Sequence, residues 1–273
     1  MNHPKQKIEK VDFRMNDIAV FYCFARSGGT LINRCLGCIK DNLVLSEVNP
    51  HGALLPVENQ ALDWLKLVSS DQFKNFHDLN YGQKISFLNK NASALNKHLI
   101  IRDWSTLNFL RNVYWEYFSP SMILEQGLYL SNYDLQANCV VVTRQSACVY
   151  ESIVRCFPDQ IHLSVEEFSE SYLAYAKAVC NYPVIHFEKF CAEPEVQFQK
   201  LCGYLGVKFE RSFLTQFHRF NQCTGDNQLS SPSKSRTATE IMVPTKKRNS
   251  KTWQVASTNE NCRKADELLG YEI

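Results

Sequence analysis

The chain has 273 residues, 45% of them hydrophobic, and its 30 lysines and arginines nearly balance 28 aspartates and glutamates. This size allows one large hydrophobic core, and we expect a single domain over residues 1–273. The formal net charge of +2 is small, so any attraction to a polyanion must come from a local cluster, and bulk charge says little about partners. No nucleic-acid partner is expected.

The N-terminal residues and the cysteines bear on where the protein is located. Residues 1–16 are mostly charged or polar and are expected to form a polar N-terminal extension. No apolar run reaches the ~20 residues that a helix needs to span a bilayer, so neither a secretory leader nor a membrane span is expected. The eleven cysteines are scattered, and several lie inside apolar runs, as reduced cysteines do. These features predict a cytoplasmic protein.

Short apolar segments alternate with segments of helical periodicity along the chain. Strands are predicted, in chain order, over residues 17–24, 43–45, 98–102, 138–143 and 183–187. Helices are predicted after the glycine-rich turn at 25–30 and over residues 58–68, 81–96, 107–118, 147–156, 165–180 and 195–205. This alternation predicts an α/β fold with a mostly parallel sheet flanked by helices on both faces.

A glycine-rich turn, Ala25-Arg26-Ser27-Gly28-Gly29-Thr30, separates the first strand from the first helix. Such a turn directs several backbone N–H groups and a helix N-terminus at one point, and this geometry binds anions. The corresponding loop of ATP- and GTP-binding proteins, G-x-x-x-x-G-K-[ST], has a lysine that reaches the terminal phosphates. Here Gly29 stands in the position of that lysine and Cys23 in the position of the first glycine. An ordinary kinase or NTPase loop is therefore disfavoured.

The segment FARSGGTLINRCL resembles the 5'-phosphosulfate loop of sulfotransferases, which commonly reads P-[KR]-S-G-[ST]-[ST] before an apolar helix. The resemblance implies a P-loop-like sulfotransferase fold and the sulfuryl donor 3'-phosphoadenosine 5'-phosphosulfate (PAPS). It assigns to donor binding Arg26, Ser27, Gly28, Gly29, Thr30 and Leu31. Arg26 and the loop amides would stabilise charge on the leaving phosphate. The chain departs from the pattern at Ala25, which replaces a proline, and at Gly29, which replaces a hydroxyl residue.

A second segment, NCVVVTRQSACVYESIVR, is similar to the 3'-phosphate motif of the same family. In that motif an arginine at the end of a strand is followed eight residues later by a serine, and Arg144 and Ser152 have this spacing. An arginine fork and a hydroxyl two turns into the next helix can converge on one phosphate. The resemblance therefore implies that Arg144 and Ser152 hold the 3'-phosphate that distinguishes PAPS from ATP.

Two later segments extend the resemblance. Residues 183–210 look like the strand, glutamate turn and proline-led helix found late in many sulfotransferases, which supports the fold and identifies no catalyst. Residues 221–251 are poor in aliphatic side chains and rich in serine, threonine and cations, and are expected to form a lid loop. The family closes a loop over the nucleotide at this place, so Arg236 is assigned to the nucleotide as well.

Sulfuryl transfer should follow the logic of phosphoryl transfer, with an in-line displacement and one general base for the acceptor proton. Glu47 is the first candidate, because LVLSEVNPHG resembles the segment where tyrosylprotein and related sulfotransferases place a catalytic glutamate. His51 is an alternative base. Cytosolic sulfotransferases have Lys-x-His where this chain has Arg102-Asp103-Trp104, so Arg102 is expected to steady the bridging oxygen and Asp103 is the second candidate base.

The expected acceptor is a hydroxyl or amine of a small molecule, a carbohydrate or a peptide, and the expected product is 3'-phosphoadenosine 5'-phosphate (PAP). No metal is expected, since the one CxxC pair, Cys35 and Cys38, lies in a predicted helix without a second pair or a nearby histidine. Two alternatives stay open. One is a P-loop kinase of nucleotides or small molecules, and the other is a catalytically silent sulfotransferase-like binding protein.

Overall fold

The computed structural model describes residues 17–111, 119–157, 163–225, 238–244 and 250–272. Six strands form one sheet with the order β3-β2-β4-β1-β5-β6. They are β1 (Asp17–Cys23), β2 (Asn42–Asn49), β3 (Gly52–Ala53), β4 (His98–Asp103), β5 (Gln136–Thr143) and β6 (Val184–His186). Every neighbouring pair is parallel except β2 and the short β3. The predicted mostly parallel α/β fold is confirmed, and each of the five predicted strands is present.

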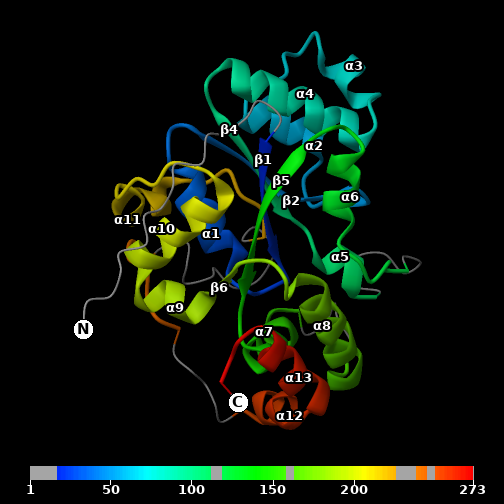
Figure 1. Ribbon diagram of the computed structural model, residues 1–273, viewed down its shortest axis with the longest axis vertical. Coiled ribbons are helices and arrows are strands. Elements are labelled where there is room, and N and C mark those ends of the chain that lie inside the picture. Colours follow the sequence, from blue (N-terminus) through cyan, green and yellow to red (C-terminus); the bar gives the residue numbers. More distant parts are fainter. Residues whose placement is uncertain (1–16, 112–118, 158–162, 226–237, 245–249, 273) are drawn as a thin grey trace.

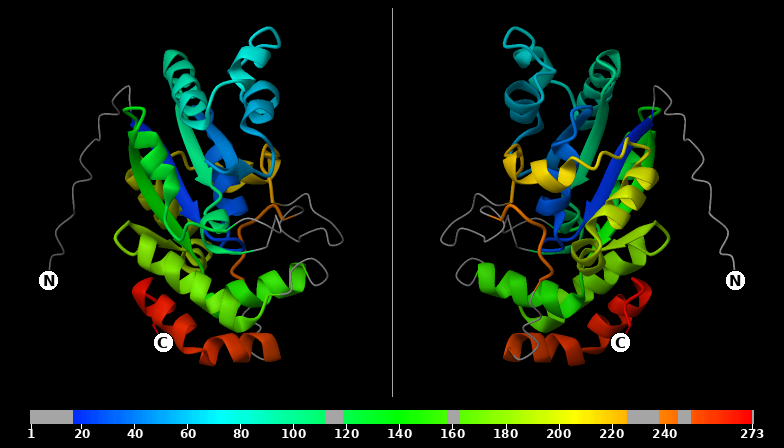
Figure 2. Two further views of the ribbon diagram at one scale, coloured as in Figure 1. Left: turned by 90° about the vertical axis from the view of Figure 1, so that its right-hand side faces the viewer. Right: turned by 90° about the vertical axis from the view of Figure 1, so that its left-hand side faces the viewer.

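Helices cover both faces of the sheet, as Figures 1 and 2 show. One face packs against α1 (Gly29–Gly37), α9 (Phe187–Ala192), α10 (Pro194–Leu205) and α11 (Phe213–Gln216). The other packs against α2 (Val57–Asn59), the π-helix η1 (Gln60–Trp64), α4 (Tyr81–Ala94), α5 (Thr106–Phe109), α6 (Glu125–Ser131), α7 (Ser146–Cys156) and α8 (Val165–Val179). The chain also forms α3 (Phe73–His77) and a 3-10 turn, η2 (Phe217–Arg219). The last two helices, α12 (Lys251–Thr258) and α13 (Glu260–Leu268), pack on α7 and α8.

Local signals explain several of these boundaries. All seven residues of β1 are buried, as expected for the central strand of a sheet that is covered on both faces. Capping boxes start α4, with Asn80 and Gln83, and α8, with Ser164 and Glu167. Pro194 opens α10, and Gly206 ends it in the left-handed conformation with φ 70°. No helix in the described part of the chain is long and apolar enough to cross a membrane.

Two predicted helices differ from the structure. The helix expected over 107–118 ends at Phe109, because the carbonyl of Asn108 accepts a hydrogen bond from the Met122 amide and Leu110 is already extended. Residues 112–118 of that prediction lie outside the described part of the chain. The helix expected over 58–68 is a short α-helix that continues as the π-helix η1, where the Leu65 amide donates to the carbonyl of Gln60. In the first segment, a contact with a later part of the chain overrides the helical periodicity.

The connections after the central strands diverge at the carboxyl edge of the sheet. The chain leaves β1 toward α1 on one face, whereas it leaves β4 and β5 toward α5 and α7 on the other. In open parallel sheets, ligands bind at the carboxyl ends of strands whose connections diverge in this way. The loop after β1 therefore lies where a ligand site is expected.

Candidate functional site

The loop between β1 and α1 has the geometry of an anion cradle. Arg26 and Gly28 both have positive φ, 66° and 93°, and the Ser27 amide donates to the carbonyl of Phe24 at 3.2 Å. The α1 helix then begins, with the Leu31 amide donating to the carbonyl of Gly28 at 3.0 Å. Helix N-termini have amides without intrahelical acceptors, and the helix dipole makes this end attractive to anions.

Gly28 is required both by its backbone and by its neighbour. Its φ of 93° lies in the left-handed region, and a Cβ added there would lie 2.1 Å from Cδ2 of Phe187. The same ring also makes a cation–π contact, because the guanidinium carbon of Arg144 lies 5.5 Å from the Phe187 ring centroid. Phe187, at the start of α9, therefore connects the loop to the end of β5.

The loop and the Arg144–Ser152 segment meet directly. Arg26 Nε donates to Ser152 Oγ at 3.1 Å, and Arg144 Nη1 donates to the carbonyl of Arg26 at 3.2 Å. Among the described residues, Ser27 Oγ and Arg144 Nε are two of several buried side-chain atoms without a hydrogen-bond partner. Their place beside a helix N-terminus and two arginines fits a bound anion.

Gly29 leaves room for an arginine from the neighbouring strand. A Cβ at this position would lie 2.6 Å from Cys23 Sγ and 2.9 Å from Arg102 Nε. The Arg102 side chain is only 5% exposed. Burial lowers the pKa of Arg102, but the Glu47 carboxylate together with Cys23 and Cys223 outweighs this and holds the pKa above its ordinary value. The buried Arg102 guanidinium therefore packs against the first turn of α1, in the space that the side chain of a hydroxyl residue at position 29 would need.

Glu47 is positioned by an irregularity in β2. The register of β2 with β4 shifts between Leu45 and Val48, and Glu47 has a φ of 51°. A bulge of this kind turns side chains away from the regular alternation of a strand. The fully buried Gln60 supports it, because its side chain accepts from the Ser46 amide at 2.7 Å and donates to the Ser46 carbonyl at 2.9 Å.

The Glu47 carboxylate lies between β4 and the segment that follows η2. Oε1 accepts from Arg102 Nη2 at 2.7 Å, and Oε2 accepts from Thr224 Oγ1 at 2.5 Å. A Cβ added to Gly225 would lie 3.0 Å from Glu47 Oε2 and 3.3 Å from Thr30 Oγ1. Glu47 and Thr30 therefore flank the same glycine, and the carboxylate is turned toward the cradle.

Asp103 belongs to a different set of contacts. It is fully buried, and its carboxylate accepts from Ser105 Oγ at 2.6 Å and from Asn49 Nδ2 at 3.2 Å. The Asn49 amide also donates to Asn108 Oδ1 at 2.8 Å, and Asn108 donates to Glu125 at 3.0 Å. Burial raises the pKa of Asp103 to about 7, while the Ser105 and Asn49 hydrogen bonds oppose the shift and Glu125 adds to it.

The remaining predicted site residues are His51, Leu31 and Arg236. His51 pairs with Glu125 and so joins the Asp103 contacts rather than those of Glu47. Leu31 is partly buried against the core beneath α1. Arg236 lies outside the described residues, as do 226–237 and 245–249 of the expected lid. All eleven cysteines are free thiols, and within the described ranges no three His, Cys, Asp or Glu side chains are grouped to hold a metal.

Several residues of the site have no local sequence signal. Gln60 lies in a segment whose sequence predicts an ordinary helix. Thr224 contacts Glu47 and Ser46, which precede it by 177 and 178 positions in the chain. Glu125 was not singled out either, because the short helix α6 that carries it has only seven residues. Phe187 was included in a matching segment, but its contact with Gly28 depends on the fold.

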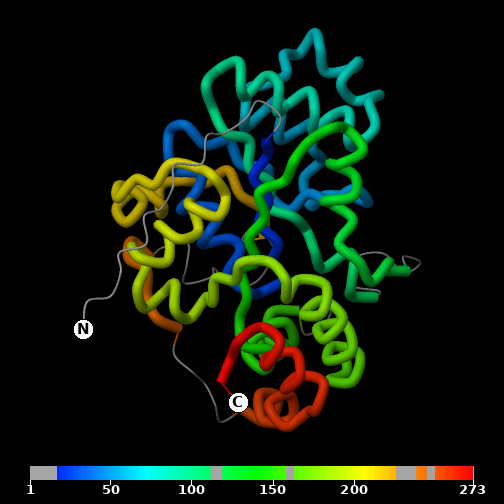
Figure 3. The backbone as a smooth tube through the Cα atoms, viewed as in Figure 1, coloured from blue at the N-terminus to red at the C-terminus, as the bar shows by residue number. Residues whose placement is uncertain are grey.

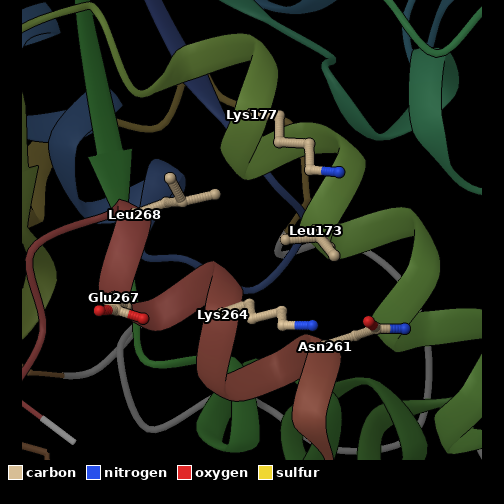
Figure 4. Close-up of a pocket in the computed structure, with 6 residues that line it drawn as sticks. All are labelled: Leu173, Lys177, Asn261, Lys264, Glu267 and Leu268. Atoms are coloured by element: carbon tan, nitrogen blue, oxygen red, sulfur yellow. The ribbon is translucent and has the colours of Figure 1, made fainter.

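A groove between α8 and α13 lies away from the cradle. Figure 4 shows it lined by Leu173 and Lys177 of α8 and by four residues of α13, namely Asn261, Lys264, Glu267 and Leu268. Lys264 already pairs with Glu260 at 2.5 Å. None of the candidate site residues lines this groove.

The fold and the cradle define a P-loop-like α/β architecture, and solved structures share it. The sulfotransferase domain of the Synechococcus PCC 7002 olefin synthase aligns with a TM-score of 0.58 and 15% identity, covering 98% of this chain and 100% of that one. The sulfotransferase domain from the curacin biosynthetic pathway aligns with a TM-score of 0.55 and 15% identity, covering 94% and 99%. No protein-family model and no curated protein matches the chain. The chain therefore has the fold of these sulfotransferase domains.

Proposed function

We propose that the protein is a sulfotransferase that moves the sulfuryl group of PAPS to a hydroxyl or amine acceptor. The observation that carries the proposal is the meeting of the 26–30 loop with Arg144 and Ser152 through two hydrogen bonds. Ser27 Oγ and Arg144 Nε supply further donors that have no partner among the described residues. A nucleotide with phosphates at both its 5' and 3' positions matches a cradle with two arginines.

The chain's own residues have distinct roles in this proposal. The amides of Ser27 to Thr30 and the Arg26 side chain bind the 5'-phosphosulfate, Leu31 packs beside the nucleotide, and Arg144 and Ser152 hold the 3'-phosphate. Arg236 would contribute from the lid. When bound, PAPS supplies the sulfuryl group: the sulfur–oxygen bond to the acceptor forms as the one to the 5'-phosphate breaks. Arg102, which lies against Gly29, would stabilise the charge that develops on the bridging oxygen.

Glu47 is the proposed general base. Each of its carboxylate oxygens accepts one hydrogen bond, from Arg102 or Thr224, and each has a second lone pair for the acceptor proton. Asp103 is less suited, since it is fully buried and its contacts with Asn49 and Ser105 belong to a different set from those beside the cradle. His51 is held by Glu125 on the Asp103 side. The acceptor is a small molecule, carbohydrate or peptide that reaches Glu47 at the sheet edge.

The alternatives differ from this proposal in their ligands. A kinase would need a lysine in the loop, where the chain has Gly29, and a metal-binding carboxylate near the terminal phosphate. A silent binding protein would bind PAP and transfer nothing. The turning of Glu47 toward Thr30 and Gly225 favours a catalytic site over a silent one.

Calorimetric titration with PAP and with ATP·Mg²⁺ tests the proposal. We expect PAP to bind much more tightly than ATP·Mg²⁺, and Arg144→Ala to weaken PAP binding by ~1.5 to 3 kcal/mol, the range for a hydrogen bond to a charged group. Arg155→Ala, which removes an exposed arginine from the same helix, is the matched control. Tight ATP·Mg²⁺ binding without PAP affinity would favour the kinase.

Turnover is a separate measurement. Incubation with ³⁵S-labelled PAPS and panels of sugars, small alcohols and amines, and peptides should label one acceptor class and release PAP. PAP binding without transfer to any panel member would favour the silent binding protein.

A further inference from the structure

The turn that carries Arg144 is held at each of its four residues, 143–146, by a different contact. Thr143 Oγ1 lies 3.2 Å from Tyr271 Oη, the Arg144 carbonyl accepts from Tyr172 Oη at 2.6 Å, the Gln145 amide donates to Glu188 at 3.3 Å, and the Ser146 amide donates to Asp266 at 2.8 Å. Two of these four contacts, those of Asp266 and Tyr271, come from the C-terminal end of the described chain. Figures 1 and 3 show this C-terminal segment beside α7 and α8.

Asp266 caps the helix that follows Arg144. The N-cap residue of α7, Gln145, makes no capping hydrogen bond with its own side chain. Asp266 Oδ1 instead accepts from the Ser146 amide, and Oδ2 accepts from Ser146 Oγ, both at 2.8 Å. An acidic group at a helix N-terminus satisfies free amides and interacts favourably with the dipole. A residue from α13 thus fixes the start of the helix that carries Ser152.

The other C-terminal contacts tie the same turn to β6 and α9. Tyr271 Oη donates to Glu188 Oε2 at 3.1 Å, so one hydroxyl touches both Thr143 and the acid that holds Gln145. His186 Nε2 lies 2.8 Å from the Leu269 carbonyl. At the start of α12, Ser250 Oγ donates to Glu151 on α7 at 2.5 Å. The segment 250–271 therefore contacts α7 at both its first turn and the turn of Ser152.

We propose that the C-terminal segment 250–271 is a positioning element for the 3'-phosphate subsite, with Asp266 as its principal residue. Asp266 touches neither nucleotide nor acceptor; it sets the direction of α7 so that Arg144 and Ser152 face Arg26 together. Its loss therefore reduces selection for nucleotides with a 3'-phosphate over those without one. This inference rests on the proposed function.

The test compares PAP with AMP, which lacks the 3'-phosphate, by calorimetry on the full chain. For Asp266→Ala we expect PAP affinity to fall by about tenfold, equal to about 1.4 kcal/mol, while AMP affinity changes less than about twofold. Glu267→Ala removes the adjacent exposed acid of α13 and should leave the ratio unchanged. Amide hydrogen exchange at residues 145–149 should be faster in Asp266→Ala than in wild type, and unchanged in Glu267→Ala.

Two milder variants keep the inference testable if Asp266→Ala does not fold. Asp266→Asn keeps the size of the side chain and one acceptor oxygen, and Ser146→Ala removes the hydroxyl that donates to Oδ2 and to the Cys262 carbonyl. Both should lower the PAP-to-AMP ratio by smaller factors than Asp266→Ala. An unchanged ratio in all three variants, with wild-type preference for PAP and sensitivity to Arg144→Ala intact, overturns the inference alone. A wild-type protein that binds PAP no better than AMP overturns the proposed function and the inference with it.

Discussion

Two neighbouring residues at the end of β4, Arg102 and Asp103, belong to two separate polar clusters. Consecutive strand residues point to opposite faces of a sheet. Arg102 pairs in register with Phe21, whose side chain packs beneath α1, and Asp103 pairs with Tyr22, whose side chain packs on the other face. The Arg102 cluster contains Glu47 and Thr224 and borders the loop. The Asp103 cluster contains Asn49, Asn108, Glu125 and His51.

The two clusters differ in charge as well as in position. Glu47 is paired with a guanidinium, so its ionised form has a partner of opposite charge. Asp103 has no cation among these neighbours: its hydrogen-bond donors are neutral, Tyr22 and Tyr81 lie near it, and Glu125 is another acid. Burial raises the pKa of Asp103 to about 7. The protein therefore has a carboxylate paired with a guanidinium beside the cradle and, on the other face of β4, a buried carboxyl whose pKa is raised. The substitutions below test whether chemistry resides on the Glu47 side alone.

Glu47→Gln should have the largest effect. It keeps the size of the side chain and an acceptor for Arg102 but removes the base, so we expect turnover to fall by ~100-fold or more. PAP affinity should be unchanged, because Glu47 does not bind the nucleotide. Steady-state kinetics with labelled PAPS and calorimetry with PAP measure the two quantities.

Glu125→Gln is the matched control for that substitution, since it changes an acid of the Asp103 cluster in the same way. Its turnover should stay close to wild type. If both variants lose turnover equally, the separation of the clusters is wrong.

Gly29→Ser should have the next largest effect, on stability and on nucleotide binding together. The sulfotransferase pattern has a hydroxyl residue here, but its Cβ would meet Cys23 Sγ and Arg102 Nε within 3 Å. Overpacking of this kind costs ~1–3 kcal/mol, measured as the free energy of unfolding in urea. Gly203→Ser in α10, where a Cβ meets nothing within 4 Å, is the control. A stable Gly29→Ser protein with tighter PAP binding would show that Arg102 does not fill the place of the hydroxyl.

The strands and the loop could be predicted from the sequence because their signals are local. The six apolar residues of β1 that follow Asp17 and the glycines after them carry the pattern without help from distant segments. The spacing of Arg144 and Ser152 is also local, and the structure places both near Arg26. Glu47 could be selected only through a resemblance. Its orientation depends on the bulge in β2, on Gln60 and on Thr224, and no short window of sequence contains all three.

The parts that the sequence analysis missed depend on distant contacts. The predicted helix over 107–118 stops at Phe109 because Met122 takes the carbonyl of Asn108. The contacts of α13 show the same dependence, since Asp266 reaches a helix that begins 120 positions earlier. Periodicity describes which side of a helix is apolar, and it contains no information on which polar residue will cap another element.

Asp103→Asn should change how stability depends on pH. The folded pKa of Asp103, about 7, is raised above its ordinary value, so its contribution to stability is complete below that ordinary value and is lost as pH rises through 7. Between pH ~4 and ~7 the free energy of unfolding of wild type should therefore fall relative to Asp103→Asn, by up to about 1.4 kcal/mol per pH unit. Urea unfolding at several pH values measures this. Parallel curves for the two proteins would contradict the raised pKa.

His51→Gln should have the smallest effect and tests the comparison most directly. Its ion pair with Glu125 is partly exposed, with the His51 side chain 30% accessible, and pairs of this kind contribute ~0.2–1 kcal/mol to stability. Because His51 contacts the Asp103 cluster and not Glu47, turnover should stay within about threefold of wild type, which is less than general base catalysis contributes. A loss of turnover as large as that of Glu47→Gln would move the base to the other face of β4. In that case the ion pair of Glu47 with Arg102 would serve only to hold the guanidinium against Gly29.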